Sequence, residues 1–336
     1  MPIINRRRLA GLTNRLLRHF DMELVRLSEL WRITSMLGYQ PPPGPTPPGR
    51  PGALHVFGPP PGDANFEFSV VIPSILRPTI ADTLRSVFAQ DFPGPVQTLI
   101  GIDQPIGDIG VVEAVCRDRP PHHTVMVLDP GYSTSVRHGG LHPARDGGVL
   151  RTVLSYLAAS RRVAYLDDDN WWAPNHLSTL AAALEGFDWA WSRRIYVHPE
   201  TRRVIGEDTW HSVGPYAGTD AADGGWVDPN CLAIDKLRCE AVLRLWGIPQ
   251  IDSNDGMTGD CRVFRILRRE FRGNDTGVAS SFYVLNDRTL DEADGRALRD
   301  RRAYLQGEID RIGRAHYDAC ADCSSGGGVH ANSSTI

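Results

Sequence analysis

The chain has 336 residues, of which 41% are hydrophobic and 23% are charged, and its formal net charge is −4 at pH 7. This length suits one α/β domain with terminal extensions, and the acidic balance argues against nucleic acid as a partner. The six cysteines form no disulfide framework, and the pair Cys320 and Cys323 is a weak basis for a redox or metal role. No apolar run approaches the roughly 20 residues of a membrane helix, and no secretory signal is present, so the sequence predicts a cytoplasmic protein.

Residues 1–39 are predicted to form an amphipathic helical segment. Apolar residues recur at spacings of three and four between Leu9 and Trp31, and the opposite face is rich in arginine. Such a helix either contacts the inner face of a membrane or packs on the protein itself or on a second copy, and the second alternative is favoured. Residues 40–65 are rich in proline and glycine, which predicts a linker without helix or strand.

The folded domain is predicted for residues 66–290, and it begins with strands and helices in alternation. The expected strands are 68–72, 96–102 and 124–128, and the expected helices are 78–88, 111–116 and 149–159. This alternation predicts a mostly parallel central sheet with helices on both faces. Ligands bind beyond the carboxyl ends of such strands. Ser74 and Asp103 follow two of these strands, and an aspartate cluster follows a further strand at 163–166, so we expect them to line one crevice.

Three consecutive carboxylates, Asp167, Asp168 and Asp169, follow an apolar strand predicted at 163–166. Adjacent carboxylates repel one another, so solvent, a cation or a partner must offset their charge. On an extended backbone, Asp167 and Asp169 point the same way and Asp168 points away. Their oxygens suit Mg²⁺ or Mn²⁺, which also binds phosphate. The alternative is a solvated acidic turn before a helix, but the apolar strand and the two tryptophans that follow favour the metal.

The pattern changes after a helix predicted at 174–184. Short strands and turns are expected at 189–191, 195–197, 204–205 and 226–234, followed by a helix at 235–245. Asp260 lies in the first turn of a further helix that begins near Thr258, where it is either a helix cap or a catalytic group. A charged helix at 291–318 is expected to pack on the domain or to self-associate, and the tail at 319–336 is expected to be disordered.

Residues from about 66 to 285 resemble the family 2 glycosyltransferases, whose nucleotide-sugar-binding fold is called GT-A. Four motifs carry the resemblance: the strand and turn V-V-I-P-S-I-L-R-P, the acid after the second strand, the triple aspartate, which looks like the family's D-x-D, and Gly259-Asp260 before a helix. The resemblance implies a single GT-A domain, and the predicted helical segments at 1–39 and 291–318 lie outside it as extensions at both ends. It assigns nucleotide-sugar binding to Pro73, Ser74, Arg77, Asp103, Asp167 and Asp168.

The resemblance implies a hexosyltransferase-type enzyme. Such an enzyme moves a sugar from a UDP-, GDP- or dTDP-linked donor to a hydroxyl group of a saccharide or another acceptor, with inversion. Asp169 and Asp167 would bind Mg²⁺ or Mn²⁺ to stabilise the departing diphosphate. Asp260 would accept the proton of the acceptor hydroxyl.

Several assignments remain open between alternatives. Trp172 and Trp226 are candidates for stacking on an acceptor sugar, and core packing is the other explanation. Arg262, beside the catalytic candidate, is expected to be solvated rather than to bind an anionic acceptor. A non-catalytic nucleotide-sugar-binding or scaffold protein of the same fold is the main alternative function. A nucleotidyltransferase is disfavoured because residues 73–77 contain no glycine for a phosphate loop.

Overall fold

The computed structural model describes residues 50–59, 66–135, 138–140, 142, 144, 147–199, 201–209, 211–248 and 258–285. The predicted segments 1–39, 291–318 and 319–336 lie outside these residues. In the part of the chain that the structure describes, no helix has both the length and the apolar character that crossing a membrane requires.

Four parallel strands form the centre of the sheet. They are β2 (Phe68–Ser74), β3 (Val96–Ile102), β4 (His123–Asp129) and β5 (Arg162–Tyr165), and they lie in the order β4-β3-β2-β5. Each neighbouring pair is parallel. The prediction of these strands from their apolar runs is confirmed.

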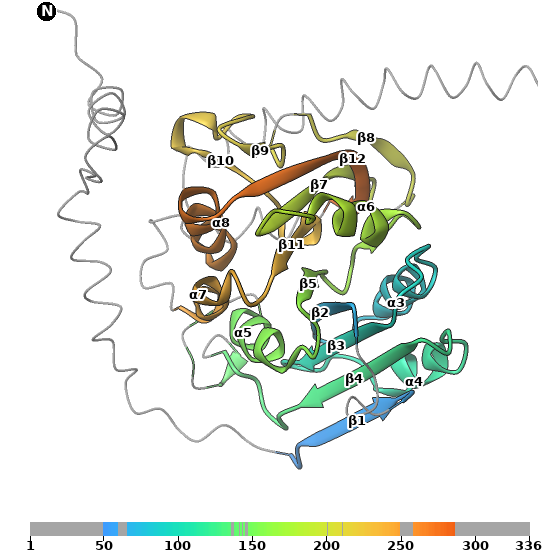
Figure 1. Ribbon diagram of the computed structural model, residues 1–336. Coiled ribbons are helices and arrows are strands. Elements are labelled where there is room, and N and C mark those ends of the chain that lie inside the picture. The colour runs from blue at the N-terminus through green and yellow to red at the C-terminus, as the bar shows by residue number, and fades with distance from the viewer. Residues whose placement is uncertain are drawn as a thin grey trace, which may run out of the picture. The chain divides into compact units, whose positions relative to one another are not determined.

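Strands on both sides extend this centre, and the described residues together form a mixed sheet of ten strands (Figure 1). On one side β1 (Ala53–Phe57) pairs antiparallel with β4. On the other side the order continues from β5 to β11 (Leu232–Asp235), β7 (Trp189–Val197), β12 (Gly273–Val284) and β6 (Trp171–Trp172), with β8 (Val204–Glu207) beside β7. A separate pair is formed by β9 (Gly214–Pro215) and β10 (Gly225–Trp226). The sheet is therefore mixed, and its longest continuous part is parallel.

Helices cover both faces of the sheet (Figure 1). One face carries α3 (Ile80–Phe88), α4 (Gly110–Cys116) and α6 (His176–Ala183), and the other carries α5 (Gly148–Leu157), α7 (Glu240–Leu243) and α8 (Gly259–Glu270). Side chains of β2 alternate between the two cores: Phe68, Val70 and Ile72 belong to the first, and Val71 belongs to the second. A strand buried on both faces explains why its sequence is continuously apolar.

Several predicted elements differ from the observed ones. The prediction that residues 40–65 contain no strand is wrong for β1, whose pairing with β4 outweighs the proline and glycine around it. The strand expected at 226–234 is interrupted by a 3₁₀ helix, η5 (Pro229–Cys231). The helix expected at 235–245 is reduced to α7 and a following 3₁₀ turn, η6 (Arg244–Gly247). The strand β12 was not predicted.

Two histidines in the core make stability sensitive to acid. His123 and His176 are fully buried, and burial lowers the pKa of His123 to about 4 and that of His176 to about 3. Both stay neutral in the folded protein while the unfolded chain takes up protons below about pH 6.5. Their contribution to the free energy of unfolding is therefore complete above pH 6.5 and is lost as the pH falls towards the folded pKa values.

We expect His176→Asn to remove part of this acid sensitivity. Between pH 4 and 6 the free energy of unfolding should fall less steeply in the variant, by about 1.4 kcal/mol per pH unit. Asparagine can keep a hydrogen bond with Ser280 Oγ, which lies 2.8 Å from His176 Nδ1. Urea titrations of the wild type and the variant at several pH values measure the slopes. Equal slopes would contradict the assignment.

Candidate functional site

The carboxyl ends of β2, β3 and β5 meet at one edge of the sheet, because the three strands are parallel and Ser74 pairs with Ile102 in the register. The polar residues after these strands are consequently close together. The backbone N–H of Asp103 donates to the carbonyl oxygen of Ser74 at 2.9 Å, and Ser74 Oγ donates to Asp168 Oδ2 at 2.7 Å. The sheet thus brings together the three polar strand ends expected from the sequence.

Asp168 fastens the turn after β2 to the end of β5. Asp168 is only 3% exposed. Its Oδ2 accepts hydrogen bonds from Ser74 Oγ and from the backbone N–H of Ile75 at 3.1 Å. Oδ1 accepts from Arg77 Nη1 at 2.9 Å. Burial raises the pKa of Asp168, and the positive charge of Arg77 opposes this rise. With both oxygens engaged, Asp168 holds Arg77 and the turn in place.

Asp169 carries negative charge that its surroundings offset only in part. Its side chain is 25% exposed, and it receives a hydrogen bond of 2.5 Å from the same Nη1 of Arg77 that binds Asp168. Burial and then the neighbouring charge of Asp167 raise the pKa of Asp169 to about 6, although Arg77 acts in the opposite direction. One guanidinium group is therefore shared by the carboxylates of Asp168 and Asp169.

Asp167 faces a different set of partners. It forms an ion pair with Arg151 of α5, its backbone N–H donates to Asn230 Oδ1 at 2.6 Å, and Asn230 Nδ2 donates to Asp167 Oδ2 at 3.0 Å. The expectation that Asp167 and Asp169 share one side is wrong for these contacts, because Asp168 and Asp169 share Arg77 instead. The reason is local: β5 ends at Tyr165, and a turn replaces the extended backbone that side-chain alternation requires.

Asp103 and Pro73 complete the set assigned to nucleotide binding. Asp103 Oδ1 accepts from the backbone N–H and the hydroxyl of Thr134 at 2.6 and 2.7 Å, so this carboxylate orders the segment after β4. Pro73 lies against Gly147, the residue before α5. A Cβ at Gly147 would lie 2.5 Å from Pro73 Cβ, and its φ of +67° also favours glycine. The start of α5 therefore approaches the end of β2 closely.

A cavity of about 230 Å³ connects this edge of the sheet with α8. Asp167 and Asp260, which lie far apart in the sequence, both line it, whereas Asp168 and Asp169 do not. Asp260 lies in the first turn of α8 and accepts a hydrogen bond from Thr258 Oγ1. The remaining lining residues are Gly148, Arg151, Trp226, Asp228, Pro229, Trp246, Ile248, Thr258, Gly259, Arg262 and Tyr283.

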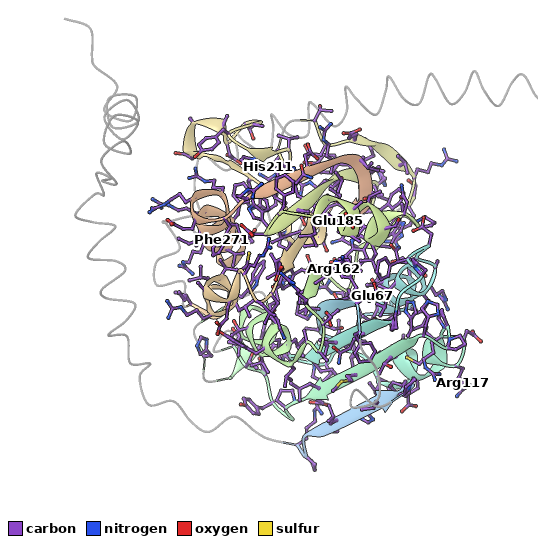
Figure 2. All side chains as sticks on the ribbon, viewed as in Figure 1. Glu67, Arg117, Arg162, Glu185, His211 and Phe271 are labelled. Carbon is purple, nitrogen blue, oxygen red and sulfur yellow. The ribbon has the colours of Figure 1, made fainter. Side chains whose placement is uncertain are left out.

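The two tryptophan candidates have different environments. Trp226 lines the cavity, and its ring centroid lies 4.6 Å from that of His211, which is labelled in Figure 2. Trp172 is 3% exposed and is not among the lining residues. Its indole N–H donates to the carbonyl oxygen of Asn230 at 2.8 Å, and its ring stacks on His176. The structure therefore places Trp172 in the core.

Arg262 is buried, contrary to the expectation that it is solvated. It is 7% exposed, lines the cavity, and donates from Nη1 to the carbonyl oxygen of Ile248 at 2.9 Å. Arg151 and Asn230 were not identified from the sequence as part of the site. Their contacts with Asp167 join residues 16 and 63 positions apart, and no local pattern marks either residue.

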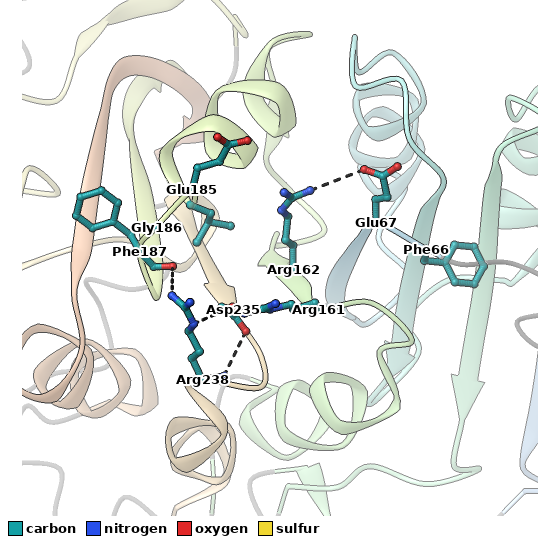
Figure 3. A pocket seen from close by; sticks show the side chains of 10 residues that line it. Phe66, Glu67, Arg161, Arg162, Glu185, Gly186, Phe187, Asp235 and Arg238 are labelled. Carbon is teal, nitrogen blue, oxygen red and sulfur yellow. Dashed lines mark hydrogen bonds and ion pairs between the residues drawn. The ribbon is translucent and has the colours of Figure 1, made fainter.

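A larger cavity, of about 450 Å³, lies at the opposite edge of the parallel strands (Figure 3). It is lined by residues at the amino ends of β2 and β5, among them Glu67 and Arg162, which form an ion pair at 3.8 Å. Asp235 lies between Arg161 and Arg238 in the same cavity. None of the predicted site residues lines it. Because ligands of parallel sheets bind at the carboxyl ends, the smaller cavity is the candidate site.

The acidic cluster fits a divalent cation only in part. Among the described residues, no group of three or more histidine, cysteine, aspartate or glutamate side chains is arranged to hold a metal ion. Asp167 and Asp169 nevertheless have partly exposed carboxylate side chains, and burial, followed by the charge of Asp167, raises the pKa of Asp169. These residues suit Mg²⁺ or Mn²⁺ bound by one or two carboxylates, with phosphate oxygens and water as the other ligands.

Among known proteins, this chain is similar only to solved structures. No family model matches the chain, and no curated protein matches it. The chain is similar to Staphylococcus aureus TarS 1–349 in complex with UDP-GlcNAc, at 15% identity and a TM-score of 0.44, over 66% of this chain and 59% of that one. It is also similar to the mannosyltransferase PcManGT from Pyrobaculum calidifontis in complex with GDP-Man and Mn²⁺, at 14% identity and a TM-score of 0.44, over 90% and 84% of the two chains.

Proposed function

We propose that this protein is a metal-assisted glycosyltransferase that transfers a sugar from a nucleoside-diphosphate donor to a hydroxyl group. The observation that supports this most is that Asp167, in the acidic cluster, and Asp260, on α8, line one cavity. Sugar transfer needs positive charge for a diphosphate and a base for the attacking hydroxyl, and we assign the first to a cation held at Asp167 and the second to Asp260.

The donor is proposed to bind along the carboxyl ends of the parallel strands. Ser74 and Arg77 lie after β2, and Asp103, after β3, is assigned to the nucleotide base. Asp168 holds Arg77 in position, as its hydrogen bonds show. Asp169 and Asp167 are the residues that would hold Mg²⁺ or Mn²⁺. Once bound, such a cation supplies positive charge to the departing diphosphate.

The acceptor is proposed to enter the cavity from the side of α8. Asp260 takes the proton of the acceptor hydroxyl as the oxygen attacks the anomeric carbon, while the bond from that carbon to the diphosphate breaks. Attack from the side opposite to the leaving group inverts the anomeric configuration. Trp226 and Tyr283 line the same cavity, and sugar faces pack favourably on aromatic rings. The acceptor is therefore proposed to be a saccharide or a similar hydroxyl compound.

One observation favours a second candidate, a nucleotide-sugar-binding protein without catalysis. Arg77 pairs with Asp168 and Asp169, and Arg151 pairs with Asp167, so arginine side chains already contact every carboxylate of the cluster. If these pairs persist, the cluster would not take up a cation. Binding and turnover must therefore be measured separately.

We expect one nucleotide-sugar class to stabilise the protein when Mn²⁺ is present. Thermal unfolding with UDP-, GDP- and dTDP-linked sugars, each with and without Mn²⁺, measures this. A ligand at 100 times its dissociation constant adds about 2.7 kcal/mol to the free energy of unfolding. If none of the nucleotide sugars raises the melting temperature beyond the value with Mn²⁺ alone, the proposed donor site is contradicted.

Slow hydrolysis of the stabilising donor then separates the enzyme from the binding protein. Release of nucleoside diphosphate that depends on Mn²⁺ and on Asp260 supports the transferase. Tight donor binding without release or transfer supports the binding protein.

A further inference from the structure

Asn230 is the centre of a buried hydrogen-bond network beside the acidic cluster. It is fully buried in η5, and its side-chain oxygen accepts the backbone N–H of Asp167 at 2.6 Å. A backbone N–H can only donate, so this contact fixes which end of the amide faces Asp167. The NH₂ group is consequently directed at two carboxylates, Asp167 Oδ2 at 3.0 Å and Asp228 Oδ1 at 2.7 Å.

Asp228 binds Asn230 directly, and Arg194 in turn binds Asp228. Asp228 Oδ1 also accepts the backbone N–H of Asn230 at 2.9 Å, and Asp228 Oδ2 accepts from Arg194 Nη1 at 2.6 Å. Arg194 Nε donates to Asp208 at 2.7 Å. The side chains of these three charged residues are at most 4% exposed. A buried ion-pair network with satisfied hydrogen bonds has one preferred arrangement and resists displacement.

Aromatic rings further restrict Arg194. Its guanidinium carbon lies 5.0 Å from the ring centre of Tyr196, 5.2 Å from that of Trp226 and 4.5 Å from that of Tyr283. Trp226 and Tyr283 also line the cavity. One rigid group therefore supports both the aromatic wall of the cavity and, through Asn230, the carboxylate of Asp167.

We propose that Asn230, held by Asp228 and Arg194, is a positioning residue that fixes the carboxylate of Asp167 at the cavity. This inference rests on the proposed function, in which Asp167 helps to bind the metal and the donor. Arg151 donates a hydrogen bond to the other oxygen of Asp167, Oδ1. The two contacts, one on each oxygen, set the orientation of the carboxylate, and an outer contact of this kind matters because a metal ligand must be oriented as well as present.

A double-mutant cycle between Asn230→Ala and Asp167→Asn tests the inference. We expect Asn230→Ala to lower kcat/KM by roughly 10- to 100-fold, the range for losing a partner of a metal ligand. The affinity for nucleoside diphosphate, measured by calorimetric titration with Mn²⁺, should also fall, whereas KM for the acceptor should stay unchanged. If Asn230 acts through Asp167, the double variant should be no worse than Asp167→Asn alone.

The matched control is Asp235→Asn, at the opposite edge of the sheet. Asp235 is also buried and also pairs with arginine, through Arg161 Nε at 2.7 Å (Figure 3). The factor by which Asp235→Asn changes kcat/KM should multiply with the factor for Asp167→Asn, because the two sites share no partner. Asp228→Asn, which keeps the shape of the side chain, replaces Asn230→Ala in the cycle if the alanine variant does not fold.

The outcomes separate the inference from the proposed function. Wild-type protein that neither binds nor turns over any nucleotide sugar overturns both. Active wild-type protein in which the losses from Asn230→Ala and Asp167→Asn multiply overturns the inference and leaves the proposed function standing. The positioning role is supported if the double variant has the same kcat/KM as Asp167→Asn alone, while the losses from Asp235→Asn and Asp167→Asn multiply.

Discussion

Asp260→Asn is expected to abolish sugar transfer while donor binding remains intact. A positioned general base contributes about 10²- to 10⁴-fold to the rate, so kcat should fall within that range. The affinity for the donor should not change, because Asp260 lies on α8 whereas the proposed donor residues follow β2, β3 and β5. Donor titration in the presence of Mn²⁺, combined with steady-state transfer assays, measures the two effects separately.

The fold should tolerate this change. Asparagine keeps a side-chain oxygen that can accept the hydrogen bond from Thr258 Oγ1. Glu270→Gln is the matched control, because it removes one negative charge at the other end of the same helix, where the side chain is 51% exposed. It should leave kcat unchanged. Full transfer activity in Asp260→Asn would remove Asp260 from the mechanism.

Asp169→Ala is expected to abolish the dependence of nucleotide binding on Mn²⁺. The cluster would lose one of the two carboxylates that are proposed to hold the cation. The affinity for nucleoside diphosphate in the presence of Mn²⁺ should fall by more than the roughly 10- to 100-fold that losing an outer partner of a metal ligand costs. Calorimetric titration of nucleoside diphosphate with and without Mn²⁺ measures the difference directly.

Loss of folding is not expected to explain this result. Burial and the charge of Asp167 raise the pKa of Asp169 to about 6, so at pH 7 its ionised form costs stability, and its removal should not lower the melting temperature. Asp82→Ala is the control, since Asp82 is 57% exposed on α3 and also pairs with arginine, through Arg85 and Arg202. A variant of Asp169 that keeps the full response to Mn²⁺ would exclude Asp169 as a metal ligand.

The parallel centre of the fold was predictable from local sequence. The apolar run 96–102 coincides with β3, and β2 and β4 lie within two residues of their predicted bounds. These strands are buried on both faces, so their sequences are continuously apolar and the signal is strong. The helices α3 and α8 were also predicted, because each carries one apolar face.

Elements stabilised by distant pairing were missed. β12 contains Gly273, Asn274, Asp275 and Thr276, a sequence without strand character, yet it runs parallel to β7 over most of its length. β1 is short and flanked by proline and glycine, but its five residues pair in register with β4. In both strands the partner supplies hydrogen bonds that the local sequence does not predict.

The sequence by itself determined which residues are chemically suited to the site: an apolar strand ending in three aspartates, an acid after β3, and Asp260 at a helix start. Tertiary structure decided their relations. It put Asp167 and Asp260 on one cavity, turned Asp168 and Asp169 towards Arg77, moved Trp172 into the core, and supplied Arg151 and Asn230 as partners of Asp167. The physical reason is that side-chain type and periodicity are local properties, whereas orientation and charge compensation depend on neighbours that only folding brings within hydrogen-bonding distance.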